Sequence, residues 1–260
     1  MLDLKALVDA VAGQPAGPVR LPAVPRVRVA EGCALRCPDC VAASSRGSVE
    51  REIVQHALSV VAATFSRVLF AGADPLTSST LPEAVQAARA LGLAVEVLTP
   101  GVLLTDATAR HCRRMGIERL RVSVDPARVG FKDSLRGAAA SHSVGLPVDL
   151  QLTVQGTVEP AWVQWISCLA TLPVERILVA TDSCQTPTTP VAQWVAMRVA
   201  TDLLASLRQD GGPAVCVEGD AFHERLVCEA VERIAGRDAG QQAGRLLIGD
   251  AVRARRARTS

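Results

Sequence analysis

Aromatic residues, long hydrophobic runs and an excess of one charge are what this sequence lacks. It contains no tyrosine, four phenylalanines and three tryptophans, so aromatic stacking is a limited resource for any ligand site. No apolar run approaches the roughly 18 residues that a transmembrane helix needs. The start of the chain, Met1-Leu-Asp-Leu-Lys, lacks the basic and then apolar form of a signal peptide. We therefore expect a cytoplasmic protein that does not interact with membranes.

Basic and acidic residues are nearly balanced, 28 to 26, which gives a net charge of +2. A general nucleic-acid binder usually has a strong basic excess, so we expect no nucleic-acid partner. Apolar residues make up 49% of the 260 residues, enough for one sizeable core. Cysteine, in contrast, is plentiful. Eight cysteines in a cytosolic chain of this size indicate metal binding or catalysis sooner than disulfides.

Three of these cysteines, Cys33, Cys37 and Cys40, fall within eight residues. A structural zinc site needs four tetrahedral ligands, commonly in two short clusters, but the chain has no second Cys-x-x-Cys and no histidine pair with zinc-finger spacing. Iron–sulfur clusters are also held by thiolates, and three protein ligands would leave one iron open to a substrate or cofactor. The bland alternative is three ordinary buried or reactive thiols, although thiols this close rarely serve packing alone.

Hydrophobic periodicity predicts six strands that alternate with helices. The predicted strands span residues 26–30, 67–70, 94–98, 119–124, 148–154 and 176–180, and the predicted helices 48–64, 81–91, 106–115, 131–144 and 160–172. Ser48 is the predicted cap of the first of these helices. Repeated strand–helix–strand units of this length indicate an α/β fold with a parallel sheet. Periodicity does not separate an open doubly wound sheet from a barrel.

The same pattern divides the chain into three regions. Residues 1–25 are predicted to form a short helix and an irregular lead-in rich in proline and glycine, residues 26–185 the core, and residues 186–260 a C-terminal extension. The extension is predicted to be mostly helical, with a short strand at 214–217. Its arginine-rich end is interpreted as a solvated tail, with docking to an acidic partner as the alternative.

The spacing Cys-x-x-x-Cys-x-x-Cys, directly after the first strand of the core, resembles the signature of the radical S-adenosylmethionine (radical SAM) enzymes. The resemblance implies a [4Fe–4S] cluster bound by Cys33, Cys37 and Cys40, with SAM on the fourth iron. It implies reductive cleavage of SAM to a 5′-deoxyadenosyl radical, which abstracts hydrogen from a substrate. It also implies a partial (β/α)6 TIM-like barrel with its site at the carboxyl ends of the strands, and a one-electron donor such as flavodoxin or ferredoxin.

The stretch Gly72-Ala73-Asp74-Pro75, after the second core strand, resembles the family's Gly-Gly-Glu-Pro, which contacts the amino group of SAM. Gly72 and Pro75 match, Asp74 keeps the negative charge on a shorter side chain, and Ala73 departs from the pattern. An ammonium beside a carboxylate gains a charge-assisted hydrogen bond. The alternative is a plain strand-to-helix turn, for which glycine, aspartate and proline are all suited.

Further matches lie near the ends of later strands. Thr99-Pro100-Gly101 resembles the family's Thr-Asn-Gly. The segment Arg121-Val-Ser123-Val-Asp125-Pro resembles the family's Ser-Leu-Asp-Gly, and this resemblance places Ser123 near the SAM carboxylate or ribose. Arg136 is a candidate clamp for that carboxylate, because an arginine fork suits one, and a surface arginine is the equal alternative. Gln151 is expected to face the barrel interior by strand alternation. Thr181 ends the last core strand, where the family contacts adenine.

The other five cysteines give weaker indications. Cys112 and Cys168 lie inside predicted helices and are expected to pack in the core. Cys184 follows the last core strand, and by analogy with radical epimerases it is a candidate donor of a hydrogen atom to a substrate radical. An auxiliary cluster using Cys184, Cys216 or Cys228 is an alternative, but these residues form no Cys-x-x-Cys pair.

The sequence therefore favours a divergent radical SAM enzyme that acts on a small molecule or a peptide in a biosynthetic pathway. The altered stretch Gly72-Ala73-Asp74 keeps a second hypothesis open. This is a non-catalytic iron–sulfur or metal-binding protein, regulatory or scaffolding in role, on the same barrel.

Overall fold

The structure is a computed structural model that describes residues 19–20, 24–35, 37, 47–125, 129–154, 169, 172–181 and 214–217. The predicted helices at 3–12, in the extension and over most of 160–172 lie outside these residues. Within the described residues, no helix is both long and apolar enough to cross a membrane.

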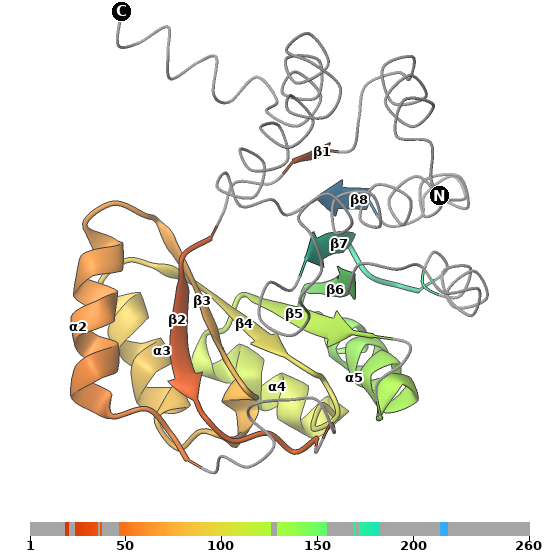
Figure 1. Ribbon diagram of the computed structural model, residues 1–260, viewed down its shortest axis with the longest axis horizontal. Helices are drawn as coiled ribbons and strands as arrows, with labels where there is room; N and C mark the ends of the chain where they lie inside the picture. Colours follow the sequence, from red (N-terminus) through yellow and green to blue (C-terminus); the bar gives the residue numbers. More distant parts are fainter. Residues whose placement is uncertain are drawn as a thin grey trace, which may run out of the picture.

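A single parallel sheet organises the described chain (Figure 1). Its strands follow the order β1-β8-β7-β6-β5-β4-β3-β2, and every neighbouring pair is parallel. In chain order the strands are β1 (Val19–Arg20), β2 (Arg26–Ala30), β3 (Arg67–Gly72), β4 (Ala94–Thr99), β5 (Arg119–Val124), β6 (Val148–Val154), β7 (Arg176–Thr181) and β8 (Ala214–Val217). Consecutive strands from β2 to β7 lie side by side, as repeated right-handed strand–helix–strand units require.

The six predicted core strands are confirmed as β2 to β7, and the predicted strand at 214–217 is confirmed as β8. The expectation of an irregular 13–25 is wrong at Val19–Arg20, because these residues form β1 beside β8. The sheet thus continues beyond the predicted core range at both ends. In the described part of the chain no pairing joins β1 to β2, so the two edges stay open. The division into three regions remains a prediction.

Helices connect the strands and cover one face of the sheet (Figure 1). Their apolar sides pack with alternate strand residues into a continuous core, which includes Phe70, Val97 and Leu150. The helices are α2 (Arg51–Ala62), α3 (Leu81–Ala90), α4 (Asp106–Met115) and α5 (Phe131–Ser143), and a 3₁₀ turn, η1, spans Pro75–Thr77.

Ser48 is not the cap of α2, whose N-terminal boundary is Glu50. The backbone of Ser48 is extended and bridges to Ala30, and its hydroxyl accepts a hydrogen bond from the Ser79 N–H at 3.0 Å. The residue therefore joins the helix side of the sheet to the turn before α3. This tertiary contact overrides its local preference for a helix start.

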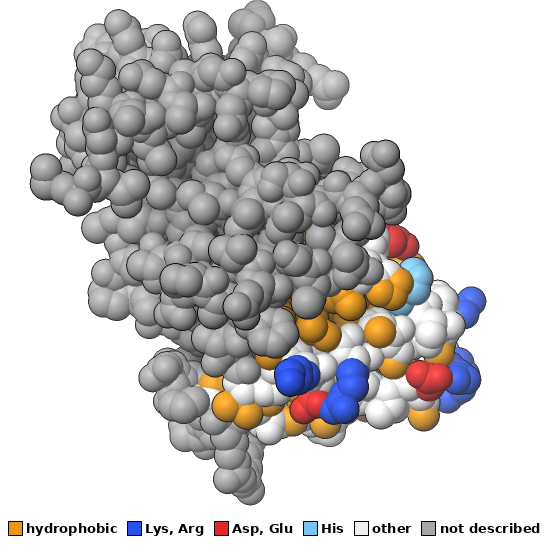
Figure 2. Space-filling view, turned by 90° about the vertical axis from the view of Figure 1, so that its right-hand side faces the viewer, with side chains coloured by type: hydrophobic (Ala, Val, Ile, Leu, Met, Phe, Trp, Pro, Cys, Tyr) orange, Lys and Arg blue, Asp and Glu red, His pale blue; other side chains and the backbone are white. Residues whose placement is uncertain are grey.

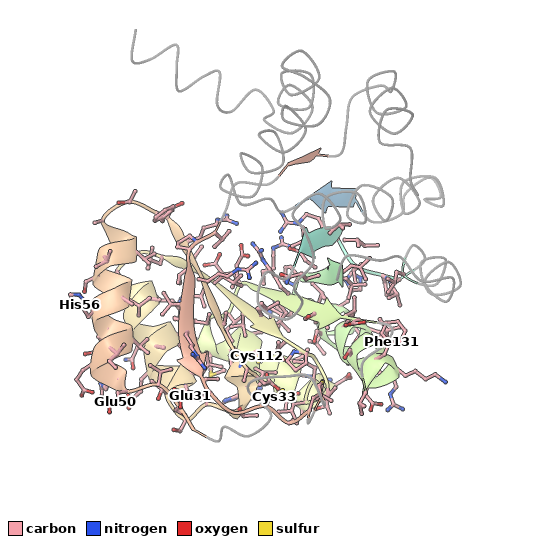
Figure 3. The ribbon with its side chains drawn as sticks, in the orientation of Figure 1. Glu31, Cys33, Glu50, His56, Cys112 and Phe131 are labelled. Atoms are coloured by element: carbon pink, nitrogen blue, oxygen red, sulfur yellow. The ribbon has the colours of Figure 1, made fainter. Side chains whose placement is uncertain are left out.

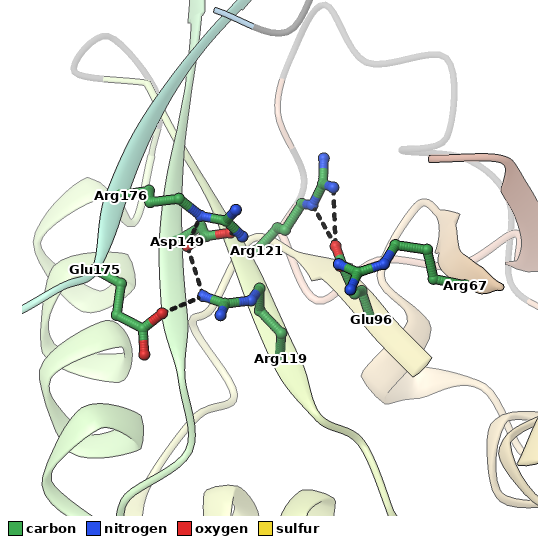
Figure 4. Close-up of polar contacts among 7 residues, drawn as sticks. All are labelled: Arg67, Glu96, Arg119, Arg121, Asp149, Glu175 and Arg176. Carbon is green, nitrogen blue, oxygen red and sulfur yellow. Dashed lines mark hydrogen bonds and ion pairs between the residues drawn. The ribbon is translucent and has the colours of Figure 1, made fainter. Parts of the chain in front are cut away.

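The opposite face of the sheet carries charge near the amino ends of the strands (Figure 4). Glu96 on β4 accepts hydrogen bonds from Arg67 at 2.9 Å and from Arg121 at 2.8 Å. Asp149 on β6 accepts from Arg119 and Arg176, each at 2.9 Å. Strand alternation separates these ion pairs, whose carboxylates are buried, from the apolar core on the helix side. Each carboxylate joins neighbouring strands and so fixes their register.

The described part of one face of the molecule is mixed in charge. On the face shown in Figure 2, blue and red side chains of the described residues lie side by side among apolar ones, without an extended area of one sign. This distribution agrees with the near balance of charges in the sequence.

Candidate active site

The loop that carries the three clustered cysteines is closed at its base by backbone hydrogen bonds. The N–H groups of Glu31 and Gly32 donate to the carbonyl of Gly47 at 3.0 and 3.3 Å, and the Val49 N–H donates to the Val29 carbonyl at 3.2 Å. The chain therefore leaves the carboxyl end of β2 and returns beside it. These bonds fix the root of the loop at the edge of the sheet where parallel-sheet proteins bind ligands.

Cys33 lies just beyond the carboxyl end of β2 (Figure 3), and both Cys33 and Cys37 are half-buried. Leu35, between them, lies against Gly130 at the start of α5, where an added Cβ would come within 2.8 Å of Leu35 Cδ2. Cys40 lies outside the described residues. No group of three metal-ligating side chains is formed within the residues that are described, so the cluster site remains a prediction.

The backbone of the motif at residues 72–75 lies close to the strand that leads into the cysteine loop. Gly72 ends β3 with φ +126°, and a Cβ at this position would lie 2.2 Å from the Ala30 carbonyl oxygen. Only glycine fits this contact and this backbone conformation. The glycine of the motif is therefore required by the packing of β3 on β2.

Beyond Gly72 the chain is bonded to the root of the cysteine loop. The Ala73 N–H donates to the Ala30 carbonyl at 3.2 Å, and the Asp74 N–H donates to the Gly32 carbonyl at 2.9 Å. The Thr77 hydroxyl also donates to Gly32, at 3.1 Å. These bonds hold the motif 72–75 against the residue that precedes Cys33. The two motifs thus form one structural unit.

The Asp74 carboxyl is fully buried. Its Oδ1 accepts hydrogen bonds from the Thr99 hydroxyl at 2.8 Å and from the Leu76 N–H at 3.2 Å, whereas its Oδ2 has no partner. Burial raises the pKa of the Asp74 carboxyl to about 6, against the opposing effect of these two bonds. Buried polar atoms are nearly always hydrogen-bonded, so this carboxylate oxygen is able to accept a further hydrogen bond.

Ser123 and Gln151 lie side by side on β5 and β6, as partners in the strand register. Ser123 is half-buried, and Gln151 is 6% exposed with no hydrogen-bond partner for its Oε1. Their shared face is opposite the helices, as the alternation of β6 predicted. Thr181 is the last residue of β7, and only its backbone is described.

Arg136 is not brought to this group. It lies on α5, where its side chain is 80% exposed and pairs with Asp133. Cys184 lies outside the described residues. The proposed roles of both residues remain predictions.

Cys112 is confirmed as a core residue of α4. Burial raises the pKa of its thiol to about 11, which keeps it protonated and unreactive.

The contact between Thr99 and Asp74 is the functional detail that sequence reasoning missed. Thr99 ends β4 and Asp74 follows β3, and these strands are neighbours in the sheet. Because the carboxyl ends of neighbouring parallel strands meet at one edge, their proximity was open to prediction.

No protein-family model matches the chain. It is 32% identical over 111 residues to an AdoMet-dependent heme synthase of Methanosarcina barkeri (strain Fusaro / DSM 804), an alignment that covers 41% of this chain and 32% of that protein. It is 26% identical over 162 residues to a PqqA peptide cyclase of Streptomyces rochei, covering 58% of this chain and 40% of that protein. The chain is similar in sequence to radical SAM enzymes.

The solved structures show the same fold. Streptococcus suis SuiB, in a crystal structure bound to S-adenosylmethionine, superimposes with a TM-score of 0.58 at 13% sequence identity, over 80% of this chain and 52% of SuiB. The predicted α/β partial barrel is thereby confirmed. The chain spans about half of SuiB and only 32% and 40% of the two curated relatives.

Proposed function

We propose that this chain is a radical SAM enzyme, in which Cys33, Cys37 and Cys40 bind a [4Fe–4S] cluster and Asp74 receives the amino group of SAM. The observation that carries the proposal is the backbone bond from Asp74 to Gly32, next to Cys33. It holds a buried carboxylate with one unpartnered oxygen beside the root of the cysteine loop. This is the arrangement that a ligand bound through both an iron and an ammonium group requires.

When bound, the cluster supplies the electron for reductive cleavage of SAM, as the family resemblance implies. The protein positions the ligand and excludes water. Burial of Asp74 strengthens its attraction for an ammonium, because the effective dielectric constant is lower inside the protein than in water. Gly72 and Ala73 allow the backbone to approach β2, so that the shorter aspartate reaches the site.

Other residues are proposed to complete the SAM site. Ser123 would donate its hydroxyl to the carboxylate or ribose, and Gln151 would accept a hydrogen bond at Oε1. Thr181 would offer its backbone to adenine. Arg136 reaches a SAM carboxylate only by exchanging its pairing with Asp133 for that carboxylate. Cys184 is retained as the proposed hydrogen-atom donor.

The substrate is proposed to be a peptide or a small molecule of a biosynthetic pathway. Two relatives support the peptide class, because one is named PqqA peptide cyclase and SuiB has been crystallised with its precursor peptide SuiA. Others, named AdoMet-dependent heme synthase and Fe-coproporphyrin III synthase, support the small-molecule class. A flavodoxin or ferredoxin is proposed as the electron donor.

The test is anaerobic reconstitution of the chain with iron and sulfide, followed by dithionite and SAM. We expect about four irons and four sulfides per chain, a brown colour, and release of 5′-deoxyadenosine. Cys37→Ala should abolish both the cluster and the product. Cys112→Ala is the matched control, since it removes a buried thiol of α4, and it should retain both. A cluster with no SAM cleavage would favour the scaffold hypothesis, and absence of iron would overturn the proposal.

A further inference from the structure

Thr99 is almost fully buried at the end of β4, and its single hydroxyl makes two bonds. The hydroxyl oxygen accepts from the Gly101 N–H at 3.1 Å, and the hydroxyl proton is donated to Asp74 Oδ1 at 2.8 Å. The amide of Gly101 occupies a lone pair of the oxygen. The proton is therefore directed to the carboxylate.

The turn that holds Thr99 is fixed by packing that does not involve Asp74. Gly101 has φ +81°, and an added Cβ there would lie 2.7 Å from Val122 Cγ1. On its other side, a Cβ at Gly137 of α5 would lie 2.2 Å from the Gly101 carbonyl oxygen. The turn is thus clamped between β5 and α5. Thr99 is a rigid support for the carboxyl rather than a side chain that follows it.

The support acts on one end of the carboxyl group only. The Thr99 hydroxyl and the Leu76 N–H both donate to Oδ1, which leaves Oδ2 without a donor. These bonds restrict rotation of the Asp74 carboxyl group about its Cβ–Cγ bond. The direction of Oδ2 is therefore fixed.

We propose that Thr99 is a positioning residue for SAM, which orients Asp74 so that its unpartnered oxygen position faces the ligand's amino group. The inference rests on the proposed function. Thr99 does not touch SAM itself and acts through Asp74. The bond matters more here than beside a glutamate, because the shorter side chain tolerates less error in direction.

The test compares Thr99→Val, which removes the hydroxyl at nearly constant volume, with Thr99→Ser, which keeps it. Binding to the full reconstituted chain is measured with S-adenosylhomocysteine, which carries the same α-amino group as SAM, and with 5′-methylthioadenosine, which lacks the α-amino group. Without the hydroxyl the carboxyl group is free to turn away from the ligand, so Thr99→Val should weaken binding of S-adenosylhomocysteine roughly tenfold. Thr99→Ser should restore binding, and 5′-methylthioadenosine should bind all variants alike.

Thr105→Val is the matched control, because Thr105 caps α4 with a similar hydroxyl away from Asp74. It should lower stability without altering either affinity. In 5′-deoxyadenosine formation, Thr99→Val should raise the KM for SAM and leave kcat nearly unchanged, as loss of uniform binding predicts. If Thr99→Val does not fold, Thr99→Ala takes its place.

The results separate the two proposals. Wild-type protein that binds neither SAM nor S-adenosylhomocysteine overturns the proposed function and this inference with it. Wild-type protein that binds them, with Thr99→Val unchanged or with both probes weakened equally, overturns the positioning role alone. The same holds if Thr99→Ser is as weak as Thr99→Val.

Discussion

The amide nitrogen of Asp74 lies 2.9 Å from the carbonyl oxygen of Gly32, so the acidic motif is bonded to the residue before the first clustered cysteine. Neither motif can shift without the other. A change that displaces the backbone at 72–74 should therefore act on the cysteine loop as well as on the carboxylate.

Gly72→Ala tests this coupling. The new Cβ would lie 2.2 Å from the Ala30 carbonyl oxygen at a φ of +126°, so β3 must move away from β2. We expect a loss of at least about 2 kcal/mol in the free energy of unfolding, and loss of SAM binding. Denaturant titration and equilibrium dialysis with SAM measure the two effects.

Gly92→Ala is the control for the backbone effect alone. Gly92 also has a positive φ, +75°, but no atom lies within 4 Å of an added Cβ. Gly92→Ala should lower the free energy of unfolding by about 1 kcal/mol and leave SAM binding intact. Equal effects of the two substitutions on SAM binding would show that contact with β2 does not matter.

The raised pKa of Asp74 predicts opposite effects of pH on stability and on ligand binding. In the ligand-free protein the carboxyl binds its proton more tightly when folded, because burial raises its pKa from 3.8 to about 6. Its contribution to stability is therefore present below about pH 4 and is lost as pH rises through about 6, by roughly 3 kcal/mol at most. SAM affinity should rise over the same interval, since the ammonium needs the ionised form.

Asp74→Asn separates these effects from those of other groups. The variant should bind SAM weakly, with an affinity that is nearly constant between pH 5 and 7, and its stability should vary less over this range than that of the wild type. Asp106→Asn, at an exposed carboxyl of α4, should behave as the wild type does. The assignment of Asp74 fails if its asparagine variant keeps the wild-type pH profile of SAM binding. Calorimetry of binding and chemical denaturation at several pH values provide the measurements.

Much of the sheet was predictable because its strands are continuous apolar runs separated by helices. The pairing of β1 with β8 was not, since two residues carry no periodicity and their partner lies at the other end of the chain. The prediction that Ser48 caps a helix was wrong for a related reason. Its local sequence favours a helix cap, but its backbone is used by a bridge to Ala30. Local preference gives way wherever distant segments compete for the same backbone groups.

The site was predictable in its chemistry but not in its geometry. Strand order alone places Asp74 and Thr99 at one edge, and alternation places Gln151 on the inner face. The direction of the Thr99 hydroxyl depends on the turn at Gly101, which only packing against α5 determines. Arg136 shows that a match in sequence spacing does not determine where a side chain lies. Its position resembles that of a family arginine, but in the structure it lies on the exposed side of a helix.

The ion pairs beneath the site yield a final prediction about stability. Glu96→Gln keeps the shape of the side chain but removes the carboxylate that accepts from Arg121, which is 2% exposed, and from Arg67. Removing this carboxylate from a guanidinium that is 2% exposed should cost about 1.5–3 kcal/mol in the free energy of unfolding. Glu175→Gln is the matched control, since Glu175 pairs with Arg119 while 47% exposed, and it should cost less than about 1 kcal/mol. Denaturant unfolding at low and high salt measures both, and salt should reduce the effect of Glu175→Gln more strongly, because exposed pairs are screened. Equal losses in the two variants would mean that Glu96 is not part of a buried, strand-joining pair.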